Sequence, residues 1–325
     1  MRLFGNASYH FIEKRKVAYV ISSVVILIGI AAMAFNTVSI GNWQNYGVDF
    51  TGGSLVQVHF DEAVTVGDVR SALGGVSGPE VTRFSGENEF VIRAQLSDAT
   101  IDEVRADIEG QLDAAFGPGS YEVSRTELVG PKIGSELQTK AGLAILFSFV
   151  LTLIYLAIRF EFRFGLAAVI ATVHDILITL GFLAVFRVEI ALPTVAAILT
   201  IVGYSLNDTI VVFDRIRENL GKKGARRQDQ AELVNRSINE TLPRTVLTSG
   251  TTLAVLLALL LVGPAVIRDF SLVLILGVVI GTYSSIFVAS PALLEIQKRM
   301  GDGDKNKKKK SKSCLLYTSP SPRDL

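Results

Sequence analysis

The residues of this sequence that could do chemistry lie inside apolar stretches rather than in polar loops. Asn207 and Asp208 interrupt an apolar run that starts near Ala191, and Tyr204 and Ser205 come four and three residues before Asp208. These spacings place Tyr204, Ser205 and Asp208 on one face of a helix. A charge at the centre of a bilayer costs about 2.5–3.5 kcal/mol on insertion scales. We therefore expect Asp208 to face a bundle interior or a water path and to have a partner.

A second polar stripe follows in the next apolar segment. Three threonines, Thr248, Thr251 and Thr252, follow Arg244 at spacings of 4, 7 and 8, so all four residues share a helical face. The two segments are predicted to be antiparallel, with Asp208 and Arg244 at similar depth, so an ion pair between them is geometrically allowed. Two interpretations stay open: a static pair that fixes helix packing, or a proton site biased by the guanidinium.

His174 and Asp175 form a third polar pair, near the middle of another apolar segment. No cation is evident at that depth, so we favour a polar contact between helices, with membership of a proton relay as the alternative. Gly277 and Gly281 form a GxxxG motif followed by Ser284 and Ser285, which favours close helix packing over a site.

No enzyme chemistry is evident in the motifs. The three histidines are scattered, and no nucleophile–base pair, phosphate loop or metal-ligand cluster is recognisable. The sequence therefore predicts no metal and no cofactor.

Helices that cross a membrane must position these polar groups. The chain is 49% hydrophobic, which is high for a soluble domain, and its apolar residues are concentrated in six segments near the ~20 residues that span hydrocarbon. We predict a polytopic α-helical membrane protein with Thr241, Leu242 and Pro243 as the N-cap and first turn of the fifth helix. The predicted helices are residues 17–36, 141–158, 165–186, 191–213, 242–262 and 270–289, the last five in a region over 138–300 with a cytoplasmic loop at 214–241.

Orientation follows from the distribution of Lys and Arg, which are enriched in cytoplasmic flanks. Basic residues precede the first helix, lie between the second and third, fill the 214–241 loop and recur in KNKKKKSK. This pattern predicts cytoplasmic termini over 1–16 and 301–312. Residues 37–137 are then extracytoplasmic, and an acidic balance over this insert argues against nucleic-acid binding.

The polar insert has its own predicted fold. Alternating and amphipathic patterns give the order β-α-β-β-α-β, which indicates a small α+β ferredoxin-like domain. Capping boxes are expected at Thr65 with Asp68 and at Thr100 with Glu103. The glycine-rich segment 47–53 lacks a phosphate-binding lysine, and we interpret it as a turn into the first strand.

The last residues, 313–325, read SCLLYTSPSPRDL and contain Cys314, the single cysteine. A back-translation of CLLYTSPSPRD matches a transposon adapter used in sequencing libraries, so we expect this segment to be an artefact and exclude it from fold reasoning. Without it, the chain has no cysteine for disulfides or metal ligation.

Five motifs together give the sequence a close resemblance to a known family. GVDFTGGSLVQV, LVGPKIGSEL, GYSLNDTIVVFDRIREN, LPRTVLTSGTT and GVVIGTYSSIFVASP resemble, in order over residues 1–300, the SecF branch of the bacterial SecD/SecF protein-export family. The resemblance implies half of a resistance-nodulation-division-type bundle, located in the bacterial inner membrane.

The resemblance also implies a function and partners. Family members of this branch pair with SecD, assist the SecYEG channel, usually with YajC, and use the proton-motive force to draw preproteins outward after SecA-driven insertion. The family's proton-relay residues map onto Asp208 and Arg244, with protons as the coupling ion. Other interpretations are a drug or lipid exporter half-unit of the same fold, or a static scaffold of the translocon.

Overall fold

A computed structural model describes residues 8–74, 80–84, 88–94, 101–159, 161–222, 228–263 and 267–300. Within these residues six helical spans are long and apolar enough to cross a membrane, which confirms the predicted helical membrane protein. The helices of these spans are α1 (Arg15–Ile40), α5 (Pro131–Arg159), α6 (Phe162–Phe186), α7 (Leu192–Gly221), α8 (Gln230–Val262) and α9 (Arg268–Ser284), which continues through a π-helical turn, η3 (Ser285–Ala289), into α10 (Ser290–Met300).

The helices extend well beyond the apolar segments, so that most of the described part of 214–241, predicted as a loop, is helical. Helix α7 runs on to Gly221, and α8 already begins at Gln230. Both extensions are amphipathic: Ile216 of α7 and Leu233 of α8 are buried in one apolar cluster near α10. Burial of that face stabilises helix where the residues are too polar for hydrocarbon.

The predicted start of the fifth helix at Thr241 is also wrong. Asp229 is the N-cap of α8, and its side chain accepts a hydrogen bond from the Ala231 amide at 3.1 Å. Pro243 lies inside the helix. The helix is continuous there because Ile238 and Leu242, on either side, pack into the bundle core, which offsets the lost backbone hydrogen bond.

The insert between α1 and α5 forms a separate sheet-and-helix layer. Its strands are β2 (Gly53–Phe60), β3 (Glu80–Arg83), β4 (Glu89–Ala94) and β5 (Tyr121–Val129), with α3 (Val66–Ala72) after β2 and α4 (Ile101–Phe116) after β4. The element order is the predicted β-α-β-β-α-β. The strands pair antiparallel in the order β3-β4-β2-β5, and one sheet face buries a core under the two helices.

One of the two predicted capping boxes can be assessed. Thr65 accepts a hydrogen bond from the Asp68 amide, and the Asp68 side chain accepts from the Thr65 amide, as predicted. The box at Thr100 lies outside the described residues, as do the tail segments 301–312 and 313–325.

The insert is joined to the membrane bundle by paired backbone and a short helix. Strand β1 (Asn45–Tyr46) pairs in parallel with β6 (Glu189–Ile190), the connection between α6 and α7. A one-turn helix, α2 (Val48–Thr51), then leads through Gly52 and Gly53, whose φ angles of 73° and 131° suit glycine. The glycine-rich segment is therefore a turn into the first long strand.

Two helix pairs in the bundle approach each other closely through glycine. A Cβ on Gly29 of α1 would lie 2.6 Å from the Gly181 Cα of α6. The predicted close packing at Gly277 and Gly281 is confirmed: a Cβ on Gly281 would lie 2.9 Å from the Ser205 Cβ of α7. Helices α1, α6, α7 and α9 are thus set at distances that bring short polar side chains together.

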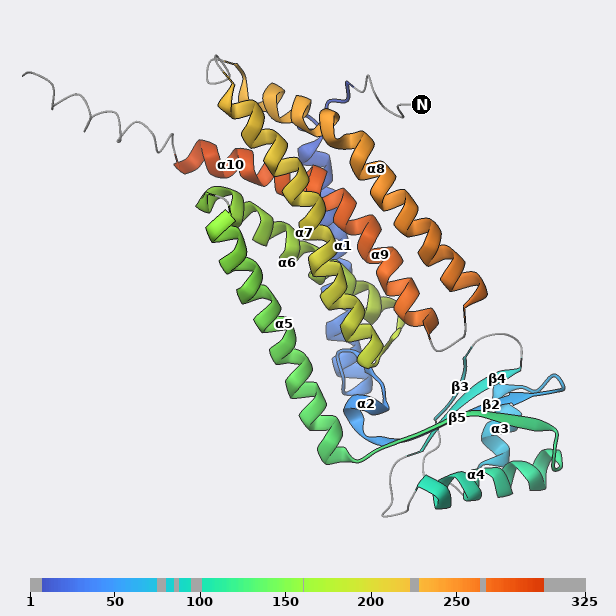
Figure 1. Ribbon diagram of the computed structural model, residues 1–325. Helices are drawn as coiled ribbons and strands as arrows, with labels where there is room; N and C mark the ends of the chain where they lie inside the picture. The colour runs from blue at the N-terminus through green and yellow to red at the C-terminus, as the bar shows by residue number, and fades with distance from the viewer. Residues whose placement is uncertain are drawn as a thin grey trace, which may run out of the picture.

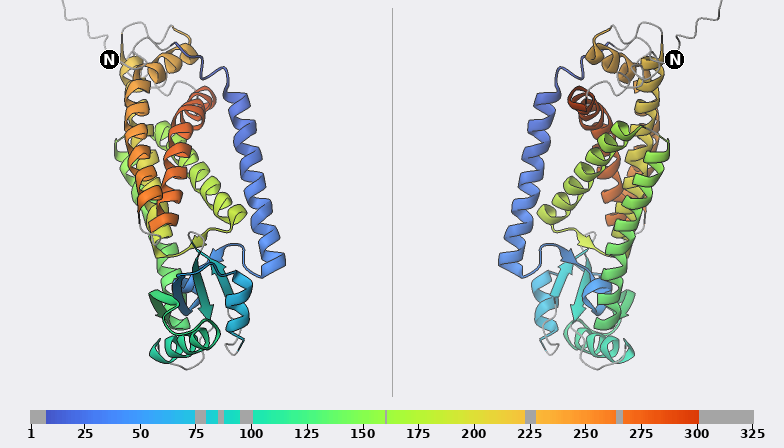
Figure 2. Two further views of the ribbon diagram at one scale, coloured as in Figure 1. Left: turned by 90° about the vertical axis from the view of Figure 1, so that its right-hand side faces the viewer. Right: turned by 90° about the vertical axis from the view of Figure 1, so that its left-hand side faces the viewer.

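The chain as a whole places the insert at one end of the bundle. The C-terminal end of α7, the N-terminal end of α8 and α10 lie at the opposite end (Figure 1). Helix α6 crosses obliquely between α1 and the other helices (Figure 2). Two apolar clusters fill the bundle: one contains Ala171, Leu206 and Ile286, the other Leu183 and Ile201. In sequence, Asp175 on α6, Ser205 on α7 and Ser284 on α9 lie between residues of the two clusters, and Asp208 lies between Leu206 and Val212 of the first cluster.

Candidate functional site

Asp208 of α7 is buried, with 6% of its surface exposed. The Thr245 hydroxyl of α8 donates to its Oδ1 at 2.8 Å, and the Ser285 hydroxyl donates to its Oδ2 at 2.6 Å. Both donors are themselves buried. Three helical segments therefore converge on one carboxylate and supply neutral hydroxyls, which can bond to the carboxyl group in either its charged or its protonated form.

Arg244 is not in contact with Asp208 in this arrangement. It is exposed on the surface of α8, and no ion pair joins it to an acid among the residues that the structure describes. The residue of α8 that faces Asp208 is Thr245, the next in the chain. Arg244 nevertheless lies close enough to Asp208 for its positive charge to act on the carboxyl group.

The remaining predicted polar residues divide between the surface and the interior. Thr248 and Thr251 are exposed and donate to backbone carbonyls of their own helix. Thr252 is half-buried, and the Tyr204 hydroxyl donates to it at 3.4 Å, which links α7 to α8. Asn207 is exposed, beside Gly203 on the same outer face of α7.

Ser205 turns away from Asp208 toward a second carboxylate. Its hydroxyl donates to Asp175 Oδ2 of α6 at 2.5 Å, and Ser284 of α9 donates to the same oxygen at 2.8 Å. The other oxygen, Oδ1, lies 2.9 Å from His174 Nδ1. Asp175 is 1% exposed and His174 7% exposed. The pair is a polar contact between helices, as favoured from the sequence, and it reaches α7 and α9.

Sequence reasoning missed the hydroxyl donors that hold both carboxylates. Ser284 and Ser285 were interpreted as part of a packing motif, whereas each donates to a different aspartate. Thr245 is the partner of Asp208 on α8, whereas the sequence pattern indicated its charged neighbour Arg244. The detectable signal was the tandem Ser-Ser within an apolar segment, because two adjacent hydroxyls on a helix point about 100° apart and can serve two partners.

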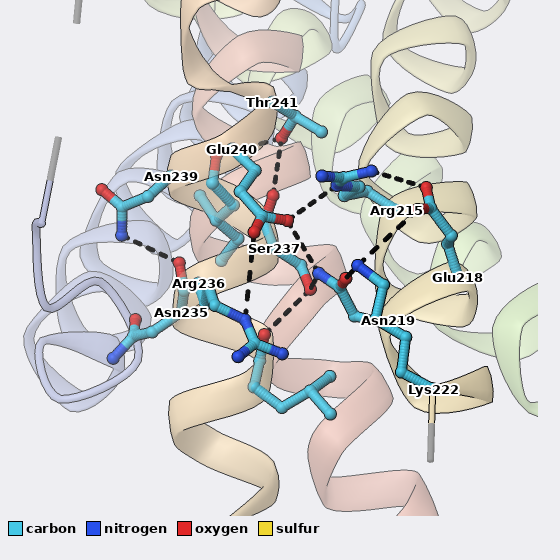
Figure 3. Close-up of polar contacts among 12 residues, drawn as sticks. Arg215, Glu218, Asn219, Lys222, Asn235, Arg236, Ser237, Asn239, Glu240 and Thr241 are labelled. Carbon is cyan, nitrogen blue, oxygen red and sulfur yellow. Dashed lines mark hydrogen bonds and ion pairs between the residues drawn. The ribbon is translucent and has the colours of Figure 1, made fainter. Parts of the chain in front are cut away.

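A polar cluster closes the α7–α8 hairpin at the end opposite the insert (Figure 3). The Arg215 guanidinium pairs with Glu240 at 2.7 Å and with Glu218 at 2.6 Å. The buried Asn219 side chain donates to Ser237 at 2.9 Å and to Glu240 at 2.8 Å. Together with Asn219, Arg215 and Glu218 fix the register of α7 against α8, and hence the alignment of Asp208 with Thr245.

The charged groups at the insert end include one buried ion pair. Arg93 of β4 pairs with Glu189 of β6, and both side chains are less than one-fifth exposed. Burial raises the pKa of the Glu189 carboxyl, while the Arg93 guanidinium opposes that rise. Within the described ranges, no group of three or more His, Cys, Asp or Glu side chains is placed to hold a metal ion.

Comparison with protein families matches two segments of the chain. Residues 110–299 match the family described as protein export membrane protein SecD/SecF, C-terminal, and residues 45–64 match the SecD/SecF GG motif. The first segment carries Asp175, Asp208 and Arg244, and the second carries the glycine-rich turn.

Curated and solved relatives agree with the family match. The protein translocase subunit SecF of Gemmatimonas aurantiaca is 47% identical over 92% of this chain and 90% of its own length. That of Vibrio alginolyticus is 43% identical over 88% and 89%. The crystal structure of SecDF, a translocon-associated membrane protein from Thermus thermophilus, matches with a TM-score of 0.77 at 39% identity over 92% of this chain. This chain spans 40% of that solved chain.

Proposed function

The chain belongs to the SecD/SecF family of protein-export membrane proteins, and from that premise we propose that it is a proton-driven accessory subunit of the Sec translocase. It would work with a SecD subunit to promote preprotein export across the bacterial inner membrane. The observation that carries the proton-driven part is Asp208: a buried carboxylate, at membrane depth, held by two hydroxyls and no cation among the described residues.

The proposed chemistry follows from the two positions that Arg244 could take. In the structure Asp208 accepts hydrogen bonds from two hydroxyls and makes no direct contact with Arg244, an arrangement in which the carboxyl group can hold a charge-neutralising proton. Approach of Arg244 favours the carboxylate and hence proton release. Because arginine stays charged, Arg244 biases the proton equilibrium and does not carry protons. Movement of one proton across the membrane supplies about 2.3 kcal/mol per 100 mV.

The outer face of α7 and α8 supports the proposed SecD pairing. On α7 this face carries the small or polar residues Ala196, Thr200, Gly203 and Asn207 in sequence at helical spacing, and on α8 it carries Arg244. A guanidinium facing lipid is costly, whereas a second helix bundle could satisfy it. Small residues also let partner helices approach closely. We propose that SecD covers this face.

The pairing has a direct test at Gly203, which has open space around it. Gly203→Leu should leave the chain folded but reduce co-purification with SecD by about tenfold, a loss of about 1.4 kcal/mol that is typical of one overpacked contact. Gly142→Leu, on exposed α5 with equally open surroundings, is the matched control. Unchanged recovery of SecD with Gly203→Leu would place the partner on another face.

The remaining partners and the orientation are part of the same proposal. The basic segments predict that both termini face the cytoplasm and that the insert faces outward, where it could meet a preprotein leaving SecYEG. Assistance by YajC and succession to SecA-driven insertion are implied by the family resemblance alone.

The proposed function is tested in inverted membrane vesicles that carry the SecD pair and translocate a preprotein. Asp208→Asn should preserve assembly and abolish the stimulation of export by the proton gradient. Asp214→Asn is the control, because Asp214 lies six residues away and forms an exposed ion pair with Arg159. Gradient-stimulated export at the unmodified level in Asp208→Asn would contradict the proposal, and would favour a static scaffold.

A further inference from the structure

His174 and Asp175 form a buried titratable pair that the proposed cycle at Asp208 does not use. Asp175 accepts three hydrogen bonds, from His174, Ser205 and Ser284. None of these donors is a permanent cation. The pair therefore carries a net negative charge unless it binds one proton, and a charge at this depth is costly.

The imidazole extends the pair toward α1. His174 Nε2 lies 2.9 Å from the Ser22 hydroxyl, and that hydroxyl lies 3.2 Å from the Tyr283 hydroxyl of α9. Tyr283 in turn donates to the Ala18 carbonyl at 3.0 Å. Its ring also stacks on the imidazole, with centroids 6.2 Å apart and planes 25° apart.

These hydrogen-bonded contacts supply every donor and acceptor that the His174–Asp175 pair needs, both without and with an added proton. Because the single Tyr283 proton goes to Ala18, Tyr283 Oη can accept a hydrogen bond. Without an added proton, His174 Nδ1–H donates to Asp175, and Ser22 O–H donates to Nε2. With an added proton on the imidazole, Nε2–H donates to Ser22 Oγ, and the Ser22 proton turns to Tyr283 Oη. Neither state leaves a buried polar atom unpaired, which is the costly alternative.

Among the described residues, the side chains that contact the pair from the neighbouring helices are uncharged hydroxyls. Helix α1 contributes the uncharged Ser22, α9 contributes Tyr283, and α7 contributes Ser205 with Asp208 one turn further on. Glu295 of α10 pairs with Arg15 of α1 at 3.5 Å. Among the described residues no lysine or arginine forms an ion pair with Asp175.

The two carboxylates are connected through the same pair of helices. Ser205 and Asp208 are three residues apart on α7, and Ser284 and Ser285 are adjacent on α9 and η3. Ser284 serves Asp175, and Ser285 serves Asp208. The π-helical turn begins at Ser285, where the Ser290 hydroxyl donates to the Ser285 carbonyl at 2.8 Å. Such turns are frequent at functional sites and can shift a helix by a small step.

We propose that His174 and Asp175 form a second proton-binding site, whose occupancy is coupled to that of Asp208 through the Ser284–Ser285 step of α9. The proton adds to the pair without any bond breaking elsewhere, and the Ser22 hydroxyl reorients to accommodate it. Binding of a proton at Asp208 would change the strength of its hydrogen bond with Ser285. Because Ser284 is the adjacent residue, its position at Asp175 would change as well. The coupling rests on the proposed function of Asp208, whereas proton binding by the pair does not.

The test is a pH titration of the full chain with SecD in lipid nanodiscs, followed by infrared difference spectroscopy of two sets of bands. The protonated carboxyl band reports Asp208, and the imidazole ring bands report proton binding by the His174–Asp175 pair. We expect two titrating components, one from each site. One should disappear in Asp208→Asn, and the other in Asp175→Asn and in His174→Gln. In Asp175→Asn the midpoint of the Asp208 component should move by about one pH unit. An interaction of about this size makes two sites titrate as a coupled pair.

A milder variant keeps the test independent of folding defects. Ser22→Ala removes the hydroxyl that serves both protonation states, so it should move the midpoint of the Asp175 component by about one pH unit. Ser271→Ala, which removes a buried hydroxyl bonded within its own helix to Ile267, should move neither component.

The outcomes separate the two proposals. A spectrum with no component that depends on Asp175, His174 or Ser22 would overturn the second site. A second site whose loss leaves the Asp208 midpoint unchanged would overturn the coupling. Absence of an Asp208-dependent component, with the Asp175 component present, would instead count against the proposed function.

Discussion

At the residue level, two buried aspartates are held by hydroxyl groups and one imidazole, and neither forms an ion pair with a lysine or arginine among the described residues. Asp208 accepts from Thr245 and Ser285, and Asp175 accepts from Ser205, Ser284 and His174. Hydroxyls can donate to a carboxylate or accept from a carboxylic acid. Both sites are therefore suited to gain and lose a proton without unpaired partners, whereas a permanent salt bridge would favour one state.

Arg244→Lys tests the role assigned to the guanidinium. Lysine lacks the planar fork and can lose its proton in a dry site. We expect gradient-stimulated export to fall by about tenfold, equivalent to about 1.4 kcal/mol, with assembly unchanged. The measurement is the rate of preprotein export in inverted vesicles with and without a proton gradient. Full activity would show that a generic cation is sufficient at this position.

Much of this site could be predicted from single residues, but its contacts could not. A carboxylate such as Asp208 inside an apolar run stands out because its burial is costly. Thr245 does not stand out, because hydroxyl residues are common in membrane helices and often bond only to their own backbone, as Thr248 does. Ser284 and Ser285 are noticeable as a tandem pair, but the sequence does not show that they serve two different aspartates. The exposed position of Arg244 could not be predicted either. Spacing determines which residues share a helical face, but it does not determine what that face contacts.

At the level of helices, close approach through glycine sets the position of the second site. Gly29 and Gly181 bring α1 against α6, and Ser22 reaches His174 two turns earlier on α1. The pair Gly277–Gly281 was recognisable as a motif, but Gly29 and Gly181 lie on different helices with no local signature. Helix lengths were underestimated for a similar reason: tertiary burial, as at Ile216 and Leu233, extends helices past the apolar segments.

Gly29→Val should separate α1 from α6. The new Cβ would lie 2.6 Å from the Gly181 Cα, which is backbone and must shift. We expect a loss of stability of about 1–3 kcal/mol, as for other overpacked positions, measured from the thermal unfolding of the purified chain in detergent.

Gly250→Val on α8 is the control for this prediction, because a Cβ there meets nothing within 4 Å. Equal unfolding temperatures for the two variants would show that α1 and α6 are not held at the glycine contact.

At the level of the whole molecule, the insert is attached directly to the helix that carries Asp208. Asp49 of α2 accepts from the Leu192 amide at 2.8 Å, at the N-terminus of α7, where a negative charge is favourable. Arg93 of the sheet pairs with Glu189, immediately before that helix. Movement of α7 would thus be transmitted to the insert over a short path. The sequence predicted both units but not this junction, because its partners are over 90 residues apart.

The pH dependence of folding stability in Arg93→Gln tests the contribution of the Arg93–Glu189 ion pair to this junction. With Arg93 removed, burial should raise the pKa of Glu189 further, so its ionised form destabilises the folded state. We expect a loss of about 3 kcal/mol above that pKa, as for other broken buried pairs, and recovery of stability as the pH falls and Glu189 becomes neutral. Fluorescence of Trp43, the single tryptophan, reports unfolding near the junction.

Two further variants control for this effect. Arg93→Gln combined with Glu189→Gln should recover most of the stability and lose the pH dependence. Arg105→Gln, which removes an exposed ion pair with Glu109, should cost less than about 1 kcal/mol. A pH-independent loss in Arg93→Gln would show that Glu189 is not the group left uncompensated.

The most direct measurement of the central claim is proton conduction by the chain and SecD in sealed proteoliposomes, followed with an internal pH-sensitive dye after a pH jump. The account predicts that the unmodified pair and Asp214→Asn conduct protons. It predicts that Asp208→Asn falls to the rate of protein-free liposomes while still assembling with SecD. Proton conduction by Asp208→Asn at the unmodified rate would contradict the claim that Asp208 is the carboxyl group through which protons pass.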